Sequence, residues 1–203
     1  MKKSVAETAA TRKRIISTAY KLFLSRGLAA TGVSDIMNAA GMTAGAFYRH
    51  FETKEQLIAE GNVAAFEQLA AMFKSAIAGK PARAALNALV RIYLRQAEQA
   101  EPAFLCPLGN VGSELRHADA QGRDAANAGY ARLVGAVELH VEKLKVAGHR
   151  QIAESIVSTM VGAVTLSQAV GDRSAGAAIL NSAEKTIALL LDLAPRAAIQ
   201  APA

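Results

Sequence analysis

The sequence predicts an all-α fold with about nine helices, arranged as a three-helix head followed by a larger helical body. Alanine is abundant, runs of β-branched residues are short, and five prolines occur among the 203 residues, which favours helix over sheet. Apolar residues recur at helical spacing, and no segment shows the strict alternation of a strand. Because 52% of the residues are hydrophobic and 20% are charged, the chain can bury a substantial core.

The head is predicted to begin with a helix over residues 11–26. Ala19 and Phe23 lie one helical turn apart on its apolar stripe, and Gly27 is a typical C-terminal stop. Residues 1–10 are expected to fray.

Two short helices are predicted next, at residues 34–40 and 44–51, with a turn at Gly41 between them. Ser34 can cap the first of these helices and Thr43 the second.

A long helix is predicted to begin at the capping-box pattern Thr53-Lys54-Glu55-Gln56 and to run to about Ala78, from the head into the body. Gly79-Lys80-Pro81 is the clearest break in the chain. Further helices are predicted at residues 82–99, 104–116, 122–147, 150–170 and 174–193.

The positive charge of the chain is concentrated in its first quarter. Residues 1–56 carry nine Lys and Arg against four Asp and Glu, a net charge of +5, and the whole chain carries +6. A basic head on a nearly neutral body is typical of a nucleic-acid-binding protein, although a solvated basic face has the same composition.

Residues 32–51 predict a helix-turn-helix motif, because two short helices meet at a glycine turn. In this geometry the second helix lies in the major groove of DNA, with its N-terminal residues near the base edges. A helix this short cannot bury both faces. Tyr48 and His50 are therefore expected to face DNA, and Phe47 and Phe51 to pack onto the first helix.

Several spaced elements occur in a specific order along residues 9–69. They are Thr11-Arg12 ahead of an Ile-rich helix, Leu22-Phe23, Gly27, VSDIMNAAG at 33–41, GAFYRHF at 45–51 and KEQL at 54–57. Together they resemble the head of TetR-family regulators. The resemblance implies a DNA-binding domain over residues 9–69 and an effector-binding and dimerisation domain over residues 70–195.

The same resemblance implies how such a protein works. A bacterial, cytoplasmic homodimer binds a near-palindromic operator in double-stranded DNA, and is associated with the nucleoid while bound. It represses transcription until a small-molecule effector releases it.

Carried over position by position, the resemblance implies a set of DNA contacts. The expected residues are Thr31, Ser34, Thr43, Ala44, Gly45, Tyr48, Arg49, His50 and Lys54. Ala44 departs from the family, which often has a basic or polar side chain there, so base reading is expected from Thr43, Ala46 or Arg49. Lys54, near a helix N-terminus, is expected to contact a phosphate.

Residues 104–115, FLCPLGNVGSEL, resemble a Cys-containing turn and short helix that lines the effector pocket in a subset of the family. The large apolar side chains that could line such a pocket favour an apolar or aromatic effector. The expected pocket residues are Phe66, Leu69, Phe73, Leu89, Ile92, Tyr93, Phe104, Cys106, Leu108, Val111, Tyr130 and Val134. The alternative is that they are simply core.

Cys106 is the single cysteine, so an intramolecular disulfide is excluded and a reducing compartment is expected. A thiol near a helix N-terminus can have a lowered pKa and react with oxidants or electrophiles. The sequence therefore leaves open a thiol-based redox sensor with an electrophilic effector, although a lone cysteine is more often an inert hydrophobic residue.

Residues 150–193 are predicted to form a dimer interface, because apolar stripes run along two consecutive helices rich in small residues. The stripes contain Ile152, Ile156, Met160, Ala163, Val164, Ile179, Ala183, Ile187 and Leu190. A two-fold dimer would hold its recognition helices about 34–36 Å apart, which predicts a near-palindromic operator. The alternative is that both helices are buried within one chain.

No motif indicates an enzyme, a cofactor or a metal site. The chain contains no G-x-S-x-G, no phosphate-binding glycine loop and no cluster of Ser, His and Asp. His117, His140 and His149 are scattered. The charge-free stretch Ser155–Gly171 is too short and too polar for a membrane span. A sequence-tolerant architectural DNA-binding protein is the other alternative, although it gives the large apolar body no role.

Overall fold

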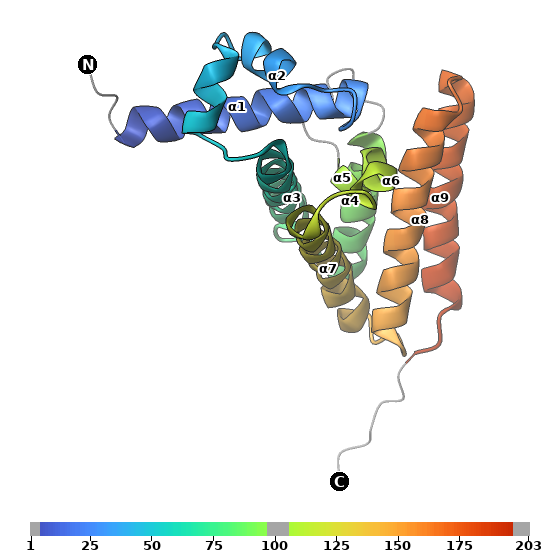
Figure 1. Cartoon of the computed structure of the whole chain (residues 1–203). Helices are drawn as coiled ribbons and strands as arrows, with labels where there is room; N and C mark the ends of the chain where they lie inside the picture. Colours follow the sequence, from blue (N-terminus) through green and yellow to red (C-terminus); the bar gives the residue numbers. More distant parts are fainter. Residues whose placement is uncertain (1–4, 97–105, 197–203) are drawn as a thin grey trace. The chain divides into compact units, whose positions relative to one another are not determined.

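The computed structural model describes residues 5–96 and 106–196, which form helices joined by short turns (Figure 1). The helices are α1 (Val5–Arg26), α2 (Val33–Ala39), the 3-10 helix η1 (Ala44–Arg49), α3 (Lys54–Ile77), α4 (Ala82–Arg95), α5 (Pro107–Asn110), α6 (Gly112–Leu115), α7 (Ala120–Lys143), α8 (His149–Ala169) and α9 (Arg173–Leu193). The β-type pairing found in these residues is an isolated bridge between Val146 and Arg196. The all-α prediction is confirmed.

Three elements differ from their predicted form. α1 begins at Val5 and takes in part of the segment expected to fray. The second short helix of the head is a six-residue 3-10 helix that ends at Arg49. The described part of the predicted helix over residues 104–116 contains two four-residue helices, because Val111 between them leaves the helical region with a φ of −122°.

The chain divides into two compact units, each described by itself. Of the described residues, unit 1 contains 5–68 and 106–129, and unit 2 contains 69–96 and 130–196. The described residues 106–129 cluster with the head in unit 1. The predicted boundary between a DNA-binding domain and a body at residue 69 stays a prediction.

Unit 1 is built around one apolar core that includes residues far apart in the chain. Its buried side chains include Phe23, Ile36, Phe47 and Phe51 from the head, joined by Leu115 of α6. α2 has seven residues and η1 has six, so neither is long enough to be stable alone. Their burial against α1, α3 and the 106–129 segment keeps them folded.

Unit 2 is centred on α4, α8 and α9. α8 packs along α9, and α4 packs against both (Figure 1). Ion pairs join α4 to α9, from Arg83 to Asp192 at 2.8 Å and from Arg91 to Glu184 at 3.0 Å. These pairs are largely exposed, so each contributes about 1 kcal/mol or less, and the apolar core supplies most of the stabilisation.

Most of the predicted dimer stripe is part of this core. Six of the predicted residues are buried within the chain itself: Ile156, Met160, Ala163, Val164, Ala183 and Ile187. Three others are half-buried: Ile152, Ile179 and Leu190. These side chains are covered by their own chain, and a dimer interface through α8 and α9 stays a prediction. The large apolar residues that stay exposed on this part of the chain are Leu166, Val170, Leu189 and Leu193.

Among the described helices, none is both long enough and apolar enough to cross a membrane.

Candidate nucleic-acid interface

The turn between α1 and α2 is held from inside unit 1. Gly27 has a φ of +86°, a left-handed conformation that glycine adopts easily, and it ends α1 as predicted. The Thr31 side chain is fully buried, and its hydroxyl donates to the carbonyl oxygen of Gly27 at 2.8 Å. Thr31 therefore anchors the turn and does not face DNA, which corrects the contact expected from the sequence.

The N-cap of α2 is Gly32, not Ser34. Oδ2 of Asp35 accepts a hydrogen bond from the backbone N–H of Gly32 at 3.0 Å. This leaves Ser34 exposed in the first turn of α2. The cap assignment was wrong, but the exposed hydroxyl is placed where a phosphate could reach it.

η1 buries one face and exposes the other. Phe47 is 0% exposed, whereas Tyr48 is 71% exposed and meets the Phe47 ring edge-on, with centroids 5.3 Å apart. The exposed side consists of Thr43, Ala44, Gly45, Tyr48 and Arg49. Thr43 is the N-cap as predicted, but its side chain makes no capping hydrogen bond.

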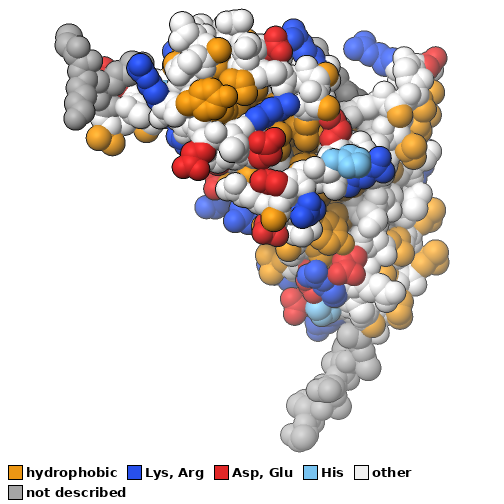
Figure 2. Space-filling view, viewed as in Figure 1, with side chains coloured by type: hydrophobic (Ala, Val, Ile, Leu, Met, Phe, Trp, Pro, Cys, Tyr) orange, Lys and Arg blue, Asp and Glu red, His pale blue; other side chains and the backbone are white. Residues whose placement is uncertain are grey.

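This exposed side has the chemistry of a DNA-contacting surface. In Figure 2, hydrophobic side chains and Lys or Arg side chains lie close together in the upper part of the view. A phenol hydroxyl and a guanidinium group can bind phosphate oxygens or base edges, and an aromatic ring can pack on a thymine methyl group.

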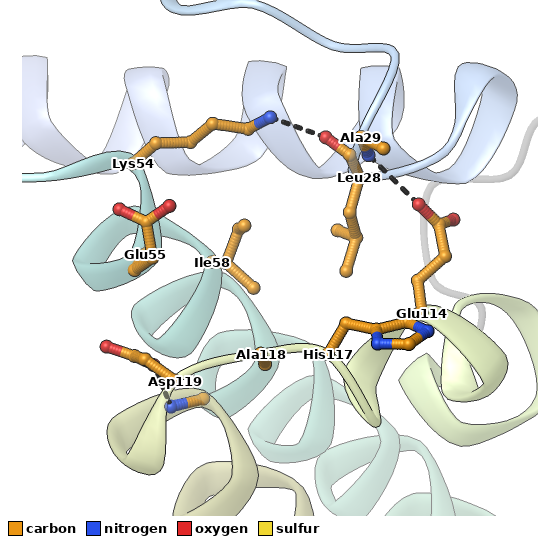
Figure 3. Close-up of a pocket in the computed structure, with 10 residues that line it drawn as sticks. Leu28, Ala29, Lys54, Glu55, Ile58, Glu114, His117, Ala118 and Asp119 are labelled. Carbon is orange, nitrogen blue, oxygen red and sulfur yellow. Dashed lines mark hydrogen bonds between the residues drawn. The ribbon is translucent and has the colours of Figure 1, made fainter.

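Lys54 opens α3, but its ammonium group is already bonded within the unit. Nζ donates to the carbonyl oxygen of Leu28 at 2.5 Å, and the side chain is half-buried (Figure 3). In this structure Lys54 supports the α1–α2 turn. A phosphate contact would have to share or replace this bond, so that contact stays a prediction.

A cavity of about 240 Å³ lies beside the same turn. Leu28 and Ile58 point into it, and the carboxylate of Glu114 in α6 accepts a hydrogen bond from the backbone N–H of Ala29 at 2.9 Å (Figure 3). A Cβ added to Gly27 would lie 2.9 Å from Oε1 of Glu114, so this carboxylate would have to shift to admit a larger residue. α6 therefore contacts the α1–α2 turn directly.

Arg12 of α1 joins three elements at the end of η1. Its guanidinium group donates to both carboxylate oxygens of Glu60 in α3, from Nε at 3.1 Å and from Nη2 at 2.5 Å. It also donates to the carbonyl oxygen of His50 and lies over the ring of Phe51, with Cζ 4.2 Å from the centroid.

In the sequence, Arg12 stands out only as part of the Thr11-Arg12 element of the family pattern, and that pattern assigns it no contact. Its partners His50 and Glu60 lie 38 and 48 positions away in the chain, so no local pattern could reveal these contacts.

Most residues expected to line an effector pocket are buried. The buried ones are Phe66, Leu69, Phe73, Leu89, Tyr93, Cys106, Val111 and Val134, while Ile92 and Leu108 are half-buried and Tyr130 is 37% exposed. Phe104 lies outside the described residues. Within unit 1, Leu108 lines an open depression of about 370 Å³ with residues of α6 and α7. A shared effector pocket stays a prediction.

Cys106 is 3% exposed and immediately precedes α5. Burial and, to a smaller degree, the nearby Cys106 raise the pKa of Tyr20 well above its ordinary value, so the thiol and the phenol share one buried environment. A buried thiol is shielded from oxidants and electrophiles in solution, whereas a reactive sensor cysteine is accessible.

Comparisons with known proteins agree with this geometry. The family described as "Bacterial regulatory proteins, tetR family" matches residues 15–60. The transcriptional repressor KstR2 of Rhodococcus jostii is 39% identical over 80 residues, which is 39% of each chain. A probable acrEF/envCD operon repressor of Escherichia coli K12 is 44% identical over 59 residues, 29% of this chain and 27% of the relative. The matches thus span less than half of these curated relatives.

Solved structures match along almost the whole chain. A TetR transcriptional regulator from Chloroflexus aurantiacus is 27% identical, with a TM-score of 0.82 over 96% of this chain and 100% of that one. Reduced NemR of Escherichia coli has the same fold at 18% identity, with a TM-score of 0.78 over 94% of this chain and 100% of that one. Residues 15–60 thus match the tetR family of bacterial regulatory proteins, and almost the whole chain has the fold of a TetR-family helix-turn-helix regulator.

Proposed function

We propose that this protein is a dimeric transcriptional repressor that binds a near-palindromic operator and is released by a small apolar effector. The observation that carries the proposal is the exposed side of η1, where Tyr48 and Arg49 face solvent while Phe47 fixes the helix in the core. Both curated relatives described above are named as repressors. In this proposal the protein acts in the bacterial cytoplasm, and the exposed side of η1 binds double-stranded DNA there.

Each DNA-contacting side chain has a distinct role in this proposal. Ser34 and Thr43 offer hydroxyl groups to phosphates, and Gly45 lets the DNA backbone approach η1 closely. Tyr48 and Arg49 reach the major groove or the phosphates beside it, and His50 lies at the end of the same surface. Thr31 acts indirectly, by holding the turn that leads into α2.

The dimer is proposed to form through the exposed apolar side chains of α8 and α9. Leu189 is 60% exposed and Leu166 is 56% exposed. Figure 2 shows hydrophobic side chains along the outer edge of these two helices. Burying such side chains against a second copy removes about 25 cal/mol of unfavourable free energy per Å² of apolar surface.

The effector is proposed to be apolar or aromatic because the candidate residues are large and apolar. An effector that binds the folded protein raises its melting temperature, so thermal unfolding in the presence of aromatic compounds is a direct screen. An electrophilic effector acting through Cys106 is not favoured, since the thiol is buried.

Two other classes of function have less support. An architectural protein would bind DNA through phosphates alone, and the relatives named above are regulators of transcription. An enzymatic role has no motif in the sequence to support it, and we propose none.

The test is the ratio of affinities for specific and random DNA at one salt concentration. A regulator should prefer its own site by about 10³-fold or more, whereas an architectural protein should show almost no preference. Equal affinities for the two duplexes would overturn the proposed function.

A further inference from the structure

η1 is too short to fix its own orientation. It has six residues and no side-chain hydrogen bond at its N-cap. On its buried face, Phe47 stacks with Phe51, with ring centroids 5.4 Å apart. Its C-terminal end carries carbonyl groups that have no partner inside the helix and need a donor from elsewhere.

That donor is Arg12. We propose that Arg12, held by Glu60, is the positioning residue that sets the orientation of η1 on DNA and does not itself contact DNA. The inference rests on the proposed function, because orientation matters only if η1 reads DNA.

The contacts of Arg12 meet what such a role requires. One guanidinium group binds the carboxylate of Glu60 and the carbonyl oxygen of His50, and lies over the Phe51 ring. A cation at the C-terminal end of a helix is also favoured by the helix dipole. The planar fork of arginine can make all these contacts at once, whereas the single ammonium group of lysine cannot.

Glu60 is itself held in place by the segment that follows η1. Nε2 of Gln56 donates to Oε1 of Glu60 at 3.1 Å. Oε1 of Gln56 accepts from the backbone N–H of Glu52 at 2.8 Å, and the backbone N–H of Gln56 donates to Oγ1 of Thr53 at 3.0 Å. α1, the end of η1 and the first turns of α3 are thus one hydrogen-bonded network.

The ion pair also removes Arg12 from the charges that face DNA. The side chains of Arg12 and Glu60 are each 32% exposed, and the carboxylate neutralises the guanidinium group. If Arg12 were a phosphate contact, neutralising Glu60 would free it and strengthen DNA binding. If Arg12 positions η1, neutralising Glu60 should weaken binding although the head becomes more positive.

The experiment compares Arg12→Ala, Arg12→Lys and Glu60→Gln with the wild-type dimer. The probe is the duplex that the wild-type protein enriches from a random DNA pool, titrated by fluorescence anisotropy at several salt concentrations. We expect Arg12→Ala and Glu60→Gln to bind about tenfold more weakly, the effect of losing one charge-assisted hydrogen bond. Arg12→Lys should lose less than Arg12→Ala.

The salt dependence separates positioning from contact. The slope of log K against log salt is negative. Removing a phosphate contact reduces its magnitude by about 0.9, whereas removing a positioning residue leaves the slope unchanged. Glu55→Gln is the matched control, because Glu55 is an exposed acid in the same helix, and this variant should bind no more weakly than wild type. Tighter binding by Glu60→Gln, or a salt dependence of Arg12→Ala that is shallower by about 0.9, would overturn the proposal.

A second readout needs no DNA. The backbone amides of His50 and Phe51 donate to the carbonyl oxygen of Phe47 at 2.8 and 3.0 Å. Their hydrogen exchange should be about tenfold faster in Arg12→Ala and Glu60→Gln, while amides of α8 keep their wild-type rates. Unchanged hydrogen exchange at these two amides would contradict the proposal that Arg12 positions η1. If the wild-type protein selects no DNA sequence, the proposed function fails, and hydrogen exchange still tests whether Arg12 and Glu60 hold η1 in place.

Discussion

Phe47 and Tyr48 are adjacent aromatic residues with opposite environments. Phe47 is fully buried and Tyr48 is 71% exposed, although their rings touch. An exposed aromatic ring on a helix with a basic neighbour contributes little to the folding stability of its own chain. Removing the Tyr48 side chain should therefore cost little folding stability and should mainly weaken binding to a partner.

Tyr48→Ala should leave folding intact and weaken operator binding by about 1–3 kcal/mol, the usual cost of losing one specific contact. Fluorescence anisotropy with the selected duplex measures the change. Tyr48→Phe is the control, because it keeps the ring and removes only the hydroxyl group. Binding by Tyr48→Ala as tight as that of wild type would remove Tyr48 from the interface.

His140 makes the stability of unit 2 depend on pH. It is 6% exposed, and neither ring nitrogen has a hydrogen-bond partner among the described residues. Burial, and then the nearby Lys143, lowers the pKa of His140 below its ordinary 6.5. The unfolded chain therefore binds this proton more readily than the folded chain does. The neutral His140 therefore contributes fully to folding stability above pH 6.5, and this contribution is lost as the pH falls towards the lowered pKa.

His140→Leu should remove this part of the pH dependence. Urea unfolding at about pH 7.5 and about pH 5.5 should show a larger loss of stability for wild type than for the variant. Equal losses in the two proteins would mean that His140 is protonated in the folded state without cost.

At the scale of elements, the sequence predicted those helices whose signals are local. The apolar stripe containing Ala19 and Phe23 predicted α1, and Gly27 predicted where this helix ends. The glycine at 41 gave the turn between α2 and η1. These predictions succeeded because helix periodicity and stop residues act within a few positions of the residues that they position.

What the sequence missed depends on contacts between distant segments. The packing of the 106–129 segment with the head and the bonds of Arg12 to His50 and Glu60 involve residues tens of positions apart. The burial of Thr31 has the same origin, because a hydroxyl suited to a phosphate is equally suited to a backbone carbonyl. Apolar stripes likewise do not reveal whether their own chain or a partner covers them.

The two turns of the head can be tested at Gly27, between α1 and α2, and at Gly41, between α2 and η1. Both have positive φ, +86° and +69°, but a Cβ at Gly27 would also meet Glu114, whereas a Cβ at Gly41 would meet nothing within 4 Å. Gly41→Ala should cost about 1–2 kcal/mol of backbone strain, and Gly27→Ala should cost more. Urea unfolding measures both.

Combining Gly27→Ala with Glu114→Ala should remove the excess cost, because the carboxylate that the new methyl group meets is then absent. An excess that persists in the double variant would rule out contact with Glu114 as its cause.

At the scale of the whole molecule, the proposed repressor needs a second copy of the chain. Leu189 is 60% exposed, whereas Ile187 in the same helix is 2% exposed. Leu189→Glu should therefore fold normally but sediment as a monomer in analytical ultracentrifugation. Ile187→Ala should instead lose about 2–5 kcal/mol of folding stability, the usual cost of a large-to-small core substitution. A Leu189→Glu variant that stays dimeric would place the interface elsewhere.

Selection of bound duplexes from a random pool at near-physiological salt tests directly whether the proposed dimer reads DNA sequence through η1. We expect a near-palindromic motif whose half-site centres lie about one helical turn apart, since the two-fold axis of the dimer imposes its symmetry on the site. If the folded protein enriches no motif, η1 does not read DNA sequence.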